Sequence, residues 1–194
     1  MHKGLPSLFI FLDKYNDEVF KNTGKNIGII YRNYNAVKNE KEILKIAKKC
    51  KKKRYQLFIS NDIKLVVKVK ANGLYIPAFN KTKILCNFEK KIKIIGSAHS
   101  QIEIKEKINQ KCEGIFISPI FKINKSKKHL GIHKFNFLSK NNNVSSFALG
   151  GINEKNYSKL KMLRINGFGG ISFFKKKTGL KRPVFLKNIF FRLS

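Results

Sequence analysis

Two glycine pairs near the end of the chain have the residue types and the setting of a phosphate-binding site. Residues 147–152 read FALGGI and residues 166–172 read NGFGGIS, so each pair adjoins a short apolar segment. Glycine has no side chain, and its backbone N–H can therefore approach an anion closely. In a parallel α/β barrel, the loops after the seventh and eighth strands hold phosphate in this way. A Gly-Gly pair is also common in tight turns, so the prediction depends on the elements around the two pairs.

The elements that position these glycines alternate between strands and helices along the chain. Apolar segments of strand length occur at 7–13, 26–32, 55–60, 74–76, 92–95, 114–117, 145–149 and 168–173. Helices are predicted at 17–20, after the cap Asn39, at 63–69, after the cap Ser100, at 134–139, at 154–163 and after Pro183. This alternation indicates βαβ units in a parallel sheet, and eight strands close a barrel, whereas an open flavodoxin-like sheet needs about five. We therefore expect an α/β protein, with a single (β/α)8 TIM barrel of short elements over residues 1–194.

Polar residues follow nearly every predicted strand, at the end where barrels of this class place their site. The set comprises Arg32, Asn61, Asp62, Tyr75, Asn80, Ser97, His99, Ser118, the loop 122–128, Gly150, Gly151 and residues 169–175. It contains one carboxylate suited to Mg²⁺, an arginine and lysines suited to phosphate, and glycines suited to backbone contacts with an anion. We therefore predict a site for a phosphorylated substrate with Mg²⁺. Two alternatives stay open: Asp62 caps the helix that follows it, and His99 orients its loop instead of transferring a proton.

The composition bears on the class of protein. Lys and Arg number 42 against 11 Asp and Glu, which gives a net charge of +31. Such a charge is typical of nucleic-acid-binding proteins, but the lysines are spread over nearly every predicted helix, and Lys, Asn, Ile and Phe are enriched together, as in a gene rich in A and T. We expect nonspecific polyanion binding at low salt. A basic nucleic-acid-binding protein is the alternative of another class.

The sequence also gives expectations for localisation. No apolar run reaches the roughly 18 residues of a membrane span, and residues 1–6 lack the long apolar region of a signal peptide. Cys50, Cys86 and Cys112 are odd in number and lie in no metal-ligand spacing, so they are expected to be reduced and buried. These features predict a cytoplasmic protein that does not insert into a membrane.

Seven short motifs, collinear along the chain, carry a resemblance to a known family of barrels. They are SND at 60–62, ANGLYI at 71–76, GSAHS at 96–100, SPIF at 118–121, LG at 130–131, ALGGI at 148–152 and GFGGI at 167–171. In this order and at these spacings, the sequence resembles the thiamine phosphate synthase and thiazole tautomerase (TenI-like) family, as a divergent member. The resemblance covers most of the chain.

The resemblance implies a transferase of thiamine biosynthesis, which couples an aminopyrimidine diphosphate to a thiazole phosphate and releases pyrophosphate with Mg²⁺. It implies that Arg32 and Asn61 lie near the pyrimidine diphosphate, Ser97 lies at the pyrimidine and Asp62 binds Mg²⁺. With a one-residue insertion, Ser126 and Lys127 supply the hydroxyl and the base of the family's loop after the sixth strand. The resulting assignment is catalytic for Arg32, Asn61, Ser97 and Lys127, phosphate-binding for Gly150, Gly151, Gly170 and Ser126, and metal-binding for Asp62.

Several positions depart from the family pattern. Asn80 stands where the family has a second acidic metal ligand, which weakens the expected Mg²⁺ site, and Tyr75 stands where it has a histidine. Ile30 and Tyr34 replace a glutamine and a lysine beside Arg32. The phosphate side of the site is therefore better kept than the metal and pyrimidine side. A thiazole tautomerase-like activity, or a barrel that only binds a phosphorylated ligand, is the alternative to coupling.

Overall fold

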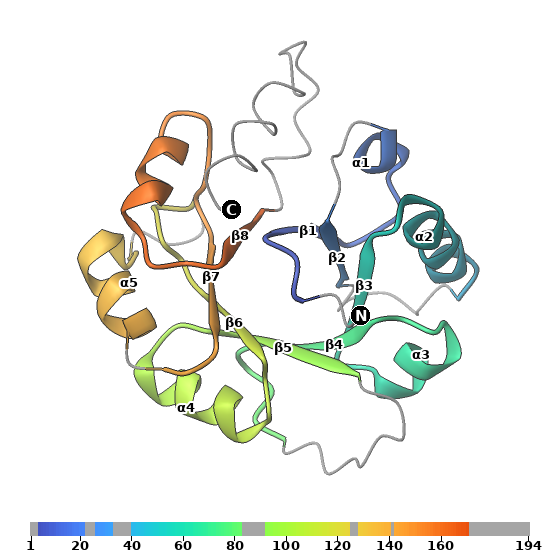
Figure 1. The fold of residues 1–194 in the computed structure, drawn as a ribbon, viewed down its shortest axis with the longest axis horizontal. Helices are drawn as coiled ribbons and strands as arrows, with labels where there is room; N and C mark the ends of the chain where they lie inside the picture. The colour runs from blue at the N-terminus through green and yellow to red at the C-terminus, as the bar shows by residue number, and fades with distance from the viewer. Residues whose placement is uncertain are drawn as a thin grey trace.

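Eight parallel strands close into a barrel, with helices around the outside (Figure 1). The computed structural model describes residues 4–21, 26–32, 40–82, 92–124, 128–140 and 142–170. The strands are β1 (Leu8–Leu12), β2 (Ile27–Tyr31), β3 (Gln56–Ser60), β4 (Gly73–Ile76), β5 (Lys93–Ala98), β6 (Gly114–Ile117), β7 (Ser145–Leu149) and β8 (Gly167–Gly170). The helices are α1 (Asp17–Lys21), α2 (Glu40–Lys53), α3 (Ile63–Lys68), α4 (Gln101–Asn109), α5 (Gly131–Lys140) and the 3-10 helix η1 (Tyr157–Met162). The predicted TIM barrel is thus confirmed.

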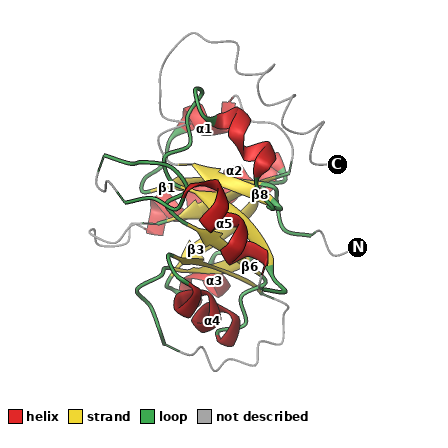
Figure 2. Cartoon of the chain, turned by 90° about the vertical axis from the view of Figure 1, so that its left-hand side faces the viewer, coloured by secondary structure: helices red, strands yellow, loops and turns green. Residues whose placement is uncertain are grey.

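The strand pairing brings all carboxyl ends to one face. Every strand pairs in parallel with the next one along the chain, and β8 pairs with β1, where Gly170 lies opposite Ile10. The side view in Figure 2 shows α5 packed along the strands and α3 and α4 beside them. Because each strand runs in the same direction, residues that directly follow the strands surround a single opening of the barrel.

The barrel encloses an aromatic core. Phe9, Phe58, Phe116 and Phe147 fill its interior, and the ring of Phe9 lies 5.0 Å from the rings of both Phe116 and Phe147, nearly edge-on. A glycine makes room for this packing, since a Cβ at Gly28 would lie 2.4 Å from Phe9 Cδ1. A second core cluster, rich in Ile and Leu, lies between the strands and the helices. Strands buried on both faces explain the continuous apolar runs of the sequence.

Two elements differ from the sequence prediction. Strand β5 continues to Ala98 instead of ending at residue 95, because residues 96–98 pair with 115–117 although they are small rather than strongly apolar. The segment 154–163 forms a turn and a short 3-10 helix instead of an α-helix. Asn153 Oδ1 accepts hydrogen bonds from the N–H groups of Lys155 and Asn156, which holds the first residues in a turn.

Other bounds shift by a few residues. Helix α5 begins at Gly131 instead of 134, and β8 begins at Gly167, while residues 171–173 and the helix predicted after Pro183 lie outside the described residues. Within the described ranges, no helix combines the length and apolar character needed to cross a membrane. Cys50 and Cys112 are buried free thiols, as predicted, and burial raises the pKa of each to about 12; Cys86 lies outside the described residues.

Candidate active site

The barrel opening has an aromatic floor. The ring of Phe11 lies 5.5 Å from that of Tyr75 and 5.4 Å from that of Phe116, in both cases steeply inclined. The guanidinium of Arg32 lies over the ring of Phe11, 5.5 Å from its centroid. Arg32 from the end of β2, Tyr75 from β4 and Ser97 from β5 are therefore gathered around the same floor.

Ser97 is held at this opening by Tyr75. The Tyr75 hydroxyl donates a hydrogen bond to Ser97 Oγ over 2.9 Å, and both side chains are buried. Because Ser97 Oγ accepts this bond, the serine hydroxyl keeps its own proton for another acceptor. The tyrosine at the family's histidine position therefore orients the predicted pyrimidine-contacting serine.

Arg32 has an acidic neighbour that the strand-end prediction did not include. Its Nε lies 3.4 Å from Asp13 Oδ1, and Asp13 directly follows β1. The signal was present in the sequence, since Asp13 ends the first apolar segment, as the other candidates end theirs. With 23% of its side chain exposed, Arg32 faces an opening where Asp13 offsets part of its charge.

Asn61 and Asp62 follow β3 in a tight turn. Asn61 adopts a left-handed conformation, with φ of 56°, and its N–H donates to Tyr75 O. Asp62 is the N-cap of α3, and its Oδ1 accepts a hydrogen bond from Leu65 N over 2.9 Å. The capping alternative for Asp62 is thus confirmed. A carboxylate has two oxygens and about four lone pairs, so the cap does not exclude a metal at the same group.

Asn80, after β4, contacts Asn61 at the end of the neighbouring strand β3. Asn80 Nδ2 donates to Asn61 Oδ1 over 2.7 Å, and Asn80 Oδ1 accepts from Thr82 N over 2.8 Å. The two amide oxygens thus already accept hydrogen bonds from the protein. Asn80, at the position of the family's second metal ligand, thus contacts Asn61, the residue before Asp62.

The two glycine pairs lie on neighbouring strands. Leu149 of β7 lies opposite Gly169 of β8, so Gly150, Gly151 and Gly170 are brought to adjacent strand ends. Gly150 and Gly151 have φ of 92° and 72°, which favour glycine, and their carbonyls accept hydrogen bonds from Phe121 N and Asn156 Nδ2. Their N–H groups donate to no acceptor in the part of the chain that the structure describes. The predicted candidates Ser126 and Lys127 lie outside the described residues.

His99 is tied to the end of β6. Its ring atom Nδ1 lies 2.8 Å from Ser118 O and 3.2 Å from Ser118 Oγ, while its backbone N–H donates to Glu103 Oε2. Ser100 caps α4, accepting from Glu103 N, as the sequence predicts. These contacts support the loop-orienting alternative for His99 over acid–base catalysis.

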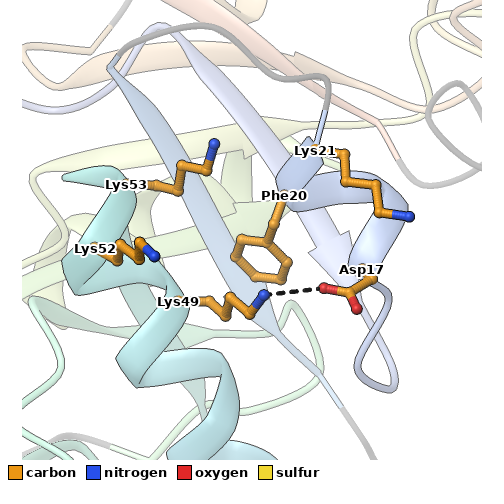
Figure 3. A pocket seen from close by; sticks show the side chains of 6 residues that line it. All are labelled: Asp17, Phe20, Lys21, Lys49, Lys52 and Lys53. Atoms are coloured by element: carbon orange, nitrogen blue, oxygen red, sulfur yellow. Dashed lines mark hydrogen bonds and ion pairs between the residues drawn. The ribbon is translucent and has the colours of Figure 1, made fainter.

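A separate hollow of about 420 Å³ lies on the outer wall between α1 and α2 (Figure 3). It is lined by Asp17, Phe20, Lys21, Lys49, Lys52 and Lys53. Lys49 pairs with Asp17 over 3.2 Å, and hydrogen bonds from Tyr15 and Lys49 lower the pKa of Asp17. None of the lining residues follows a strand directly, so this basic hollow is distinct from the barrel opening.

The fold and the strand-end residues together define an α/β barrel whose opening gathers an arginine, a serine, an aspartate and backbone amides at glycines. The family model of thiamine monophosphate synthase matches residues 23–174. The chain belongs to this family.

Curated relatives agree with this assignment. The chain is 33% identical over 125 residues to a thiamine-phosphate synthase of Prochlorococcus marinus subsp. pastoris, which covers 62% of the chain and 36% of that protein. A thiamine-phosphate synthase from another strain of Prochlorococcus marinus is 33% identical over 151 residues, or 73% of the chain and 41% of that protein. The matches thus span well under half the length of these relatives. Both are named synthases, so the tautomerase-like, ligand-binding and nucleic-acid-binding alternatives are not favoured.

A solved structure agrees with the fold. The thiamine phosphate pyrophosphorylase from Pyrococcus furiosus superposes with a TM-score of 0.76 over 97% of this chain and 96% of that chain, at 15% sequence identity. At this identity the similarity establishes the barrel fold.

Proposed function

We propose that this chain is a thiamine phosphate synthase-like transferase, which joins an aminopyrimidine diphosphate to a thiazole phosphate and releases pyrophosphate. The observation that carries the proposal is the gathering of Arg32, Asn61, Ser97 and the Gly150–Gly151 amides at the one opening of a barrel of this family. The opening provides for two anionic groups, which matches two phosphorylated substrates.

The pyrimidine side is formed by β2 to β5. The hydroxyl of Ser97, oriented by Tyr75, donates a hydrogen bond to an acceptor on the pyrimidine ring. The pyrimidine ring packs on the aromatic floor. Arg32 and the side-chain amide nitrogen of Asn61 bind the diphosphate oxygens. The bond between the pyrimidine-bearing carbon and the diphosphate breaks, and its electron pair leaves with pyrophosphate, so groups that stabilise that negative charge lower the barrier.

The thiazole side is formed by β7 and β8. The N–H groups of Gly150 and Gly151 bind the thiazole phosphate, with Gly170 on the adjacent strand. Anchored there, the thiazole presents its nucleophilic atom to the carbon that loses pyrophosphate, and the new bond forms at that carbon. Ser126 and Lys127 are proposed to complete the phosphate and leaving-group contacts from the loop after β6.

Mg²⁺ fits the residues present as an ion shared with the substrate. The described part of the chain holds no group of three or more His, Cys, Asp or Glu side chains that could bind a metal by itself. Mg²⁺ usually binds through one or two carboxylates together with substrate phosphates and water. Asp62 would be the charged protein ligand, with neutral Asn80 beside it, and the ion would neutralise charge on the leaving diphosphate.

The direct test is turnover by the purified chain. Both substrates with Mg²⁺ should give thiamine phosphate and pyrophosphate in equal amounts, measured by mass spectrometry and a pyrophosphate assay. Each substrate alone should give no thiamine phosphate. Absence of product with both substrates, in a protein that is folded by circular dichroism, would refute the proposal.

We also propose that the protein works in the cytoplasm, because its described cysteines, Cys50 and Cys112, are free thiols.

A further inference from the structure

A fully buried lysine lies behind the pyrimidine side of the barrel. Lys107, on the inner face of α4, has no exposed surface. Its Nζ donates to Asn80 O over 2.6 Å and to Gln110 Oε1 over 2.8 Å. Lysine is among the residues least often fully buried, because its charge loses hydration there. Burial lowers the pKa of Lys107 accordingly. A fully buried lysine is therefore expected to have a role other than packing.

The barrel wall is shaped to admit this side chain. A Cβ at Gly96 of β5 would lie 2.8 Å from Lys107 Cδ, so the lysine stem passes against β5 at a position where only glycine leaves room. Cys112 Sγ lies 3.0 Å from the same point, so it also occupies the space beside Gly96. The stem is therefore held in one path, and its amine is directed at the segment that follows β4.

The amine fixes the segment that carries Asn80. Gln110 Nε2 donates to Asn80 O over 3.1 Å and to Thr82 O over 2.8 Å, so Lys107 and Gln110 bind this segment together. The side chain of Asn80 in turn donates to Asn61 Oδ1, at the end of β3. A series of two hydrogen bonds thus links Lys107 to Asn61, one to the backbone carbonyl of Asn80 and one from its side chain.

We infer that Lys107 is a positioning residue for the diphosphate end of the pyrimidine substrate, an inference that rests on the proposed function. By holding Asn80 O, it fixes the backbone from which the Asn80 amide meets Asn61. The Asn61 carboxamide is then directed with its N–H groups toward the substrate, because its oxygen is already bonded to Asn80. The glycines of β7 and β8 lie on other strands and do not depend on this series.

The test compares Lys107→Met with Lys105→Met, which changes an exposed lysine of the same helix. Methionine keeps an apolar stem and removes the donors. The KM for the aminopyrimidine diphosphate should rise about tenfold in Lys107→Met, as for the loss of one charge-assisted hydrogen bond. The KM for the thiazole phosphate should stay within about twofold of wild type, because the thiazole side does not depend on Lys107. General damage to the protein would instead raise both KM values. Lys105→Met should change neither.

Two results would overturn the inference. One is a Lys107→Met protein whose melting temperature falls while neither KM changes, and the other is an equal rise in both KM values. If Lys107→Met does not fold, Gln110→Leu replaces it, since Gln110 binds the same segment. A folded Gln110→Leu protein must show the same difference between the two substrates, and its absence would overturn the inference.

Failure of the proposed function is recognised separately, by wild-type turnover. A wild type that binds the diphosphate without turnover refutes coupling, and the dissociation constants of the two ligands, measured by calorimetry, then take the place of KM in the same comparison. A wild type that binds neither ligand overturns the proposed function and the inference together.

Discussion

Asp62, at the end of β3, caps a helix and is also the proposed ligand of Mg²⁺. Its carboxylate caps α3 through Leu65 N, and in the proposed reaction it also supplies the negative charge for Mg²⁺. The two functions can be separated because asparagine caps a helix about as well as aspartate but carries no charge.

We therefore predict that Asp62→Asn lowers kcat/KM by more than about a hundredfold, because a bound Mg²⁺ contributes several kcal/mol to transition-state stabilisation. Its free energy of unfolding should stay within about 0.5 kcal/mol of wild type, since the cap remains. Urea denaturation and initial rates give both quantities. The control is Ser100→Ala, which removes the cap of α4 without a charge and should cost about 1 kcal/mol of stability at unchanged turnover. Normal turnover in Asp62→Asn would remove the metal role from this residue.

At the proposed metal side, Asn80 is the clearest departure from the family pattern, which has an acidic residue at this position. In wild type its amide nitrogen donates to Asn61 Oδ1. In Asn80→Asp, a carboxylate oxygen replaces this donor, which adds a negative charge and an oxygen ligand of the type that Mg²⁺ prefers. We predict that Mg²⁺ raises the melting temperature of Asn80→Asp but hardly that of wild type, and that the variant reaches half-maximal turnover at a lower Mg²⁺ concentration. Thermal melts across a Mg²⁺ series measure this; equal responses of the two proteins would contradict it.

Residues with a local signature were predicted better than residues that depend on distant contacts. The Ser100–Glu103 cap follows from a spacing of three residues, and the capping alternative for Asp62 follows from its place before a helix. The Arg32–Asp13 contact joins two strands, and Lys107 is buried only because Gly96 and Asn80 come together around it from other elements. Such contacts have no signal in a single stretch of sequence.

At the scale of elements, the β7–β8 pair positions the glycines of the proposed phosphate site. The sequence predicted that the two glycine pairs lie at one site, and the parallel pairing of Leu149 with Gly169 accounts for their proximity. The left-handed conformations of Gly150 and Gly151, and the carbonyls of Phe121 and Lys122 against Gly151, come from the loop after β6 and could not be predicted locally.

Gly151 and Gly131 form a matched pair for testing this loop. Both have positive φ, of 72° and 69°, but a Cβ at Gly151 would lie 2.5 Å from Phe121 O, whereas a Cβ at Gly131 meets nothing within 4 Å. We predict that Gly131→Ala costs only the backbone term, about 1 kcal/mol. Gly151→Ala should lose more stability and raise the KM for thiazole phosphate severalfold. Similar stability losses and an unchanged KM in both variants would show that the Gly151 loop does not form the phosphate site.

At the scale of the whole molecule, the count of eight apolar segments was enough to predict the closed barrel, because few other arrangements accommodate eight alternating βα units. The charge was harder to interpret, since +31 is a property of the whole surface. In the described part of the chain, positive charge gathers at the hollow between α1 and α2, where Lys52 and Lys53 lie beside the Lys49–Asp17 pair (Figure 3).

We predict that affinity for a single-stranded oligonucleotide falls linearly with salt on logarithmic axes, as nonspecific phosphate contacts require. Replacing Lys52 and Lys53 by glutamine should reduce the slope by about as much as replacing the exposed Lys64 and Lys105 of α3 and α4. Fluorescence anisotropy over a salt series measures both. A loss confined to the Lys52 and Lys53 protein would instead identify the hollow as a dedicated anion site.

The proposed reaction takes place at the carboxyl ends of the barrel strands. The most direct measurement is a crystal structure of the protein with thiamine phosphate and pyrophosphate. We predict the phosphate of thiamine phosphate about 3 Å from the N–H groups of Gly150 and Gly151, with the pyrimidine on the floor beside Tyr75 and Ser97. Products bound in the hollow between α1 and α2, with the barrel opening empty, would contradict the account.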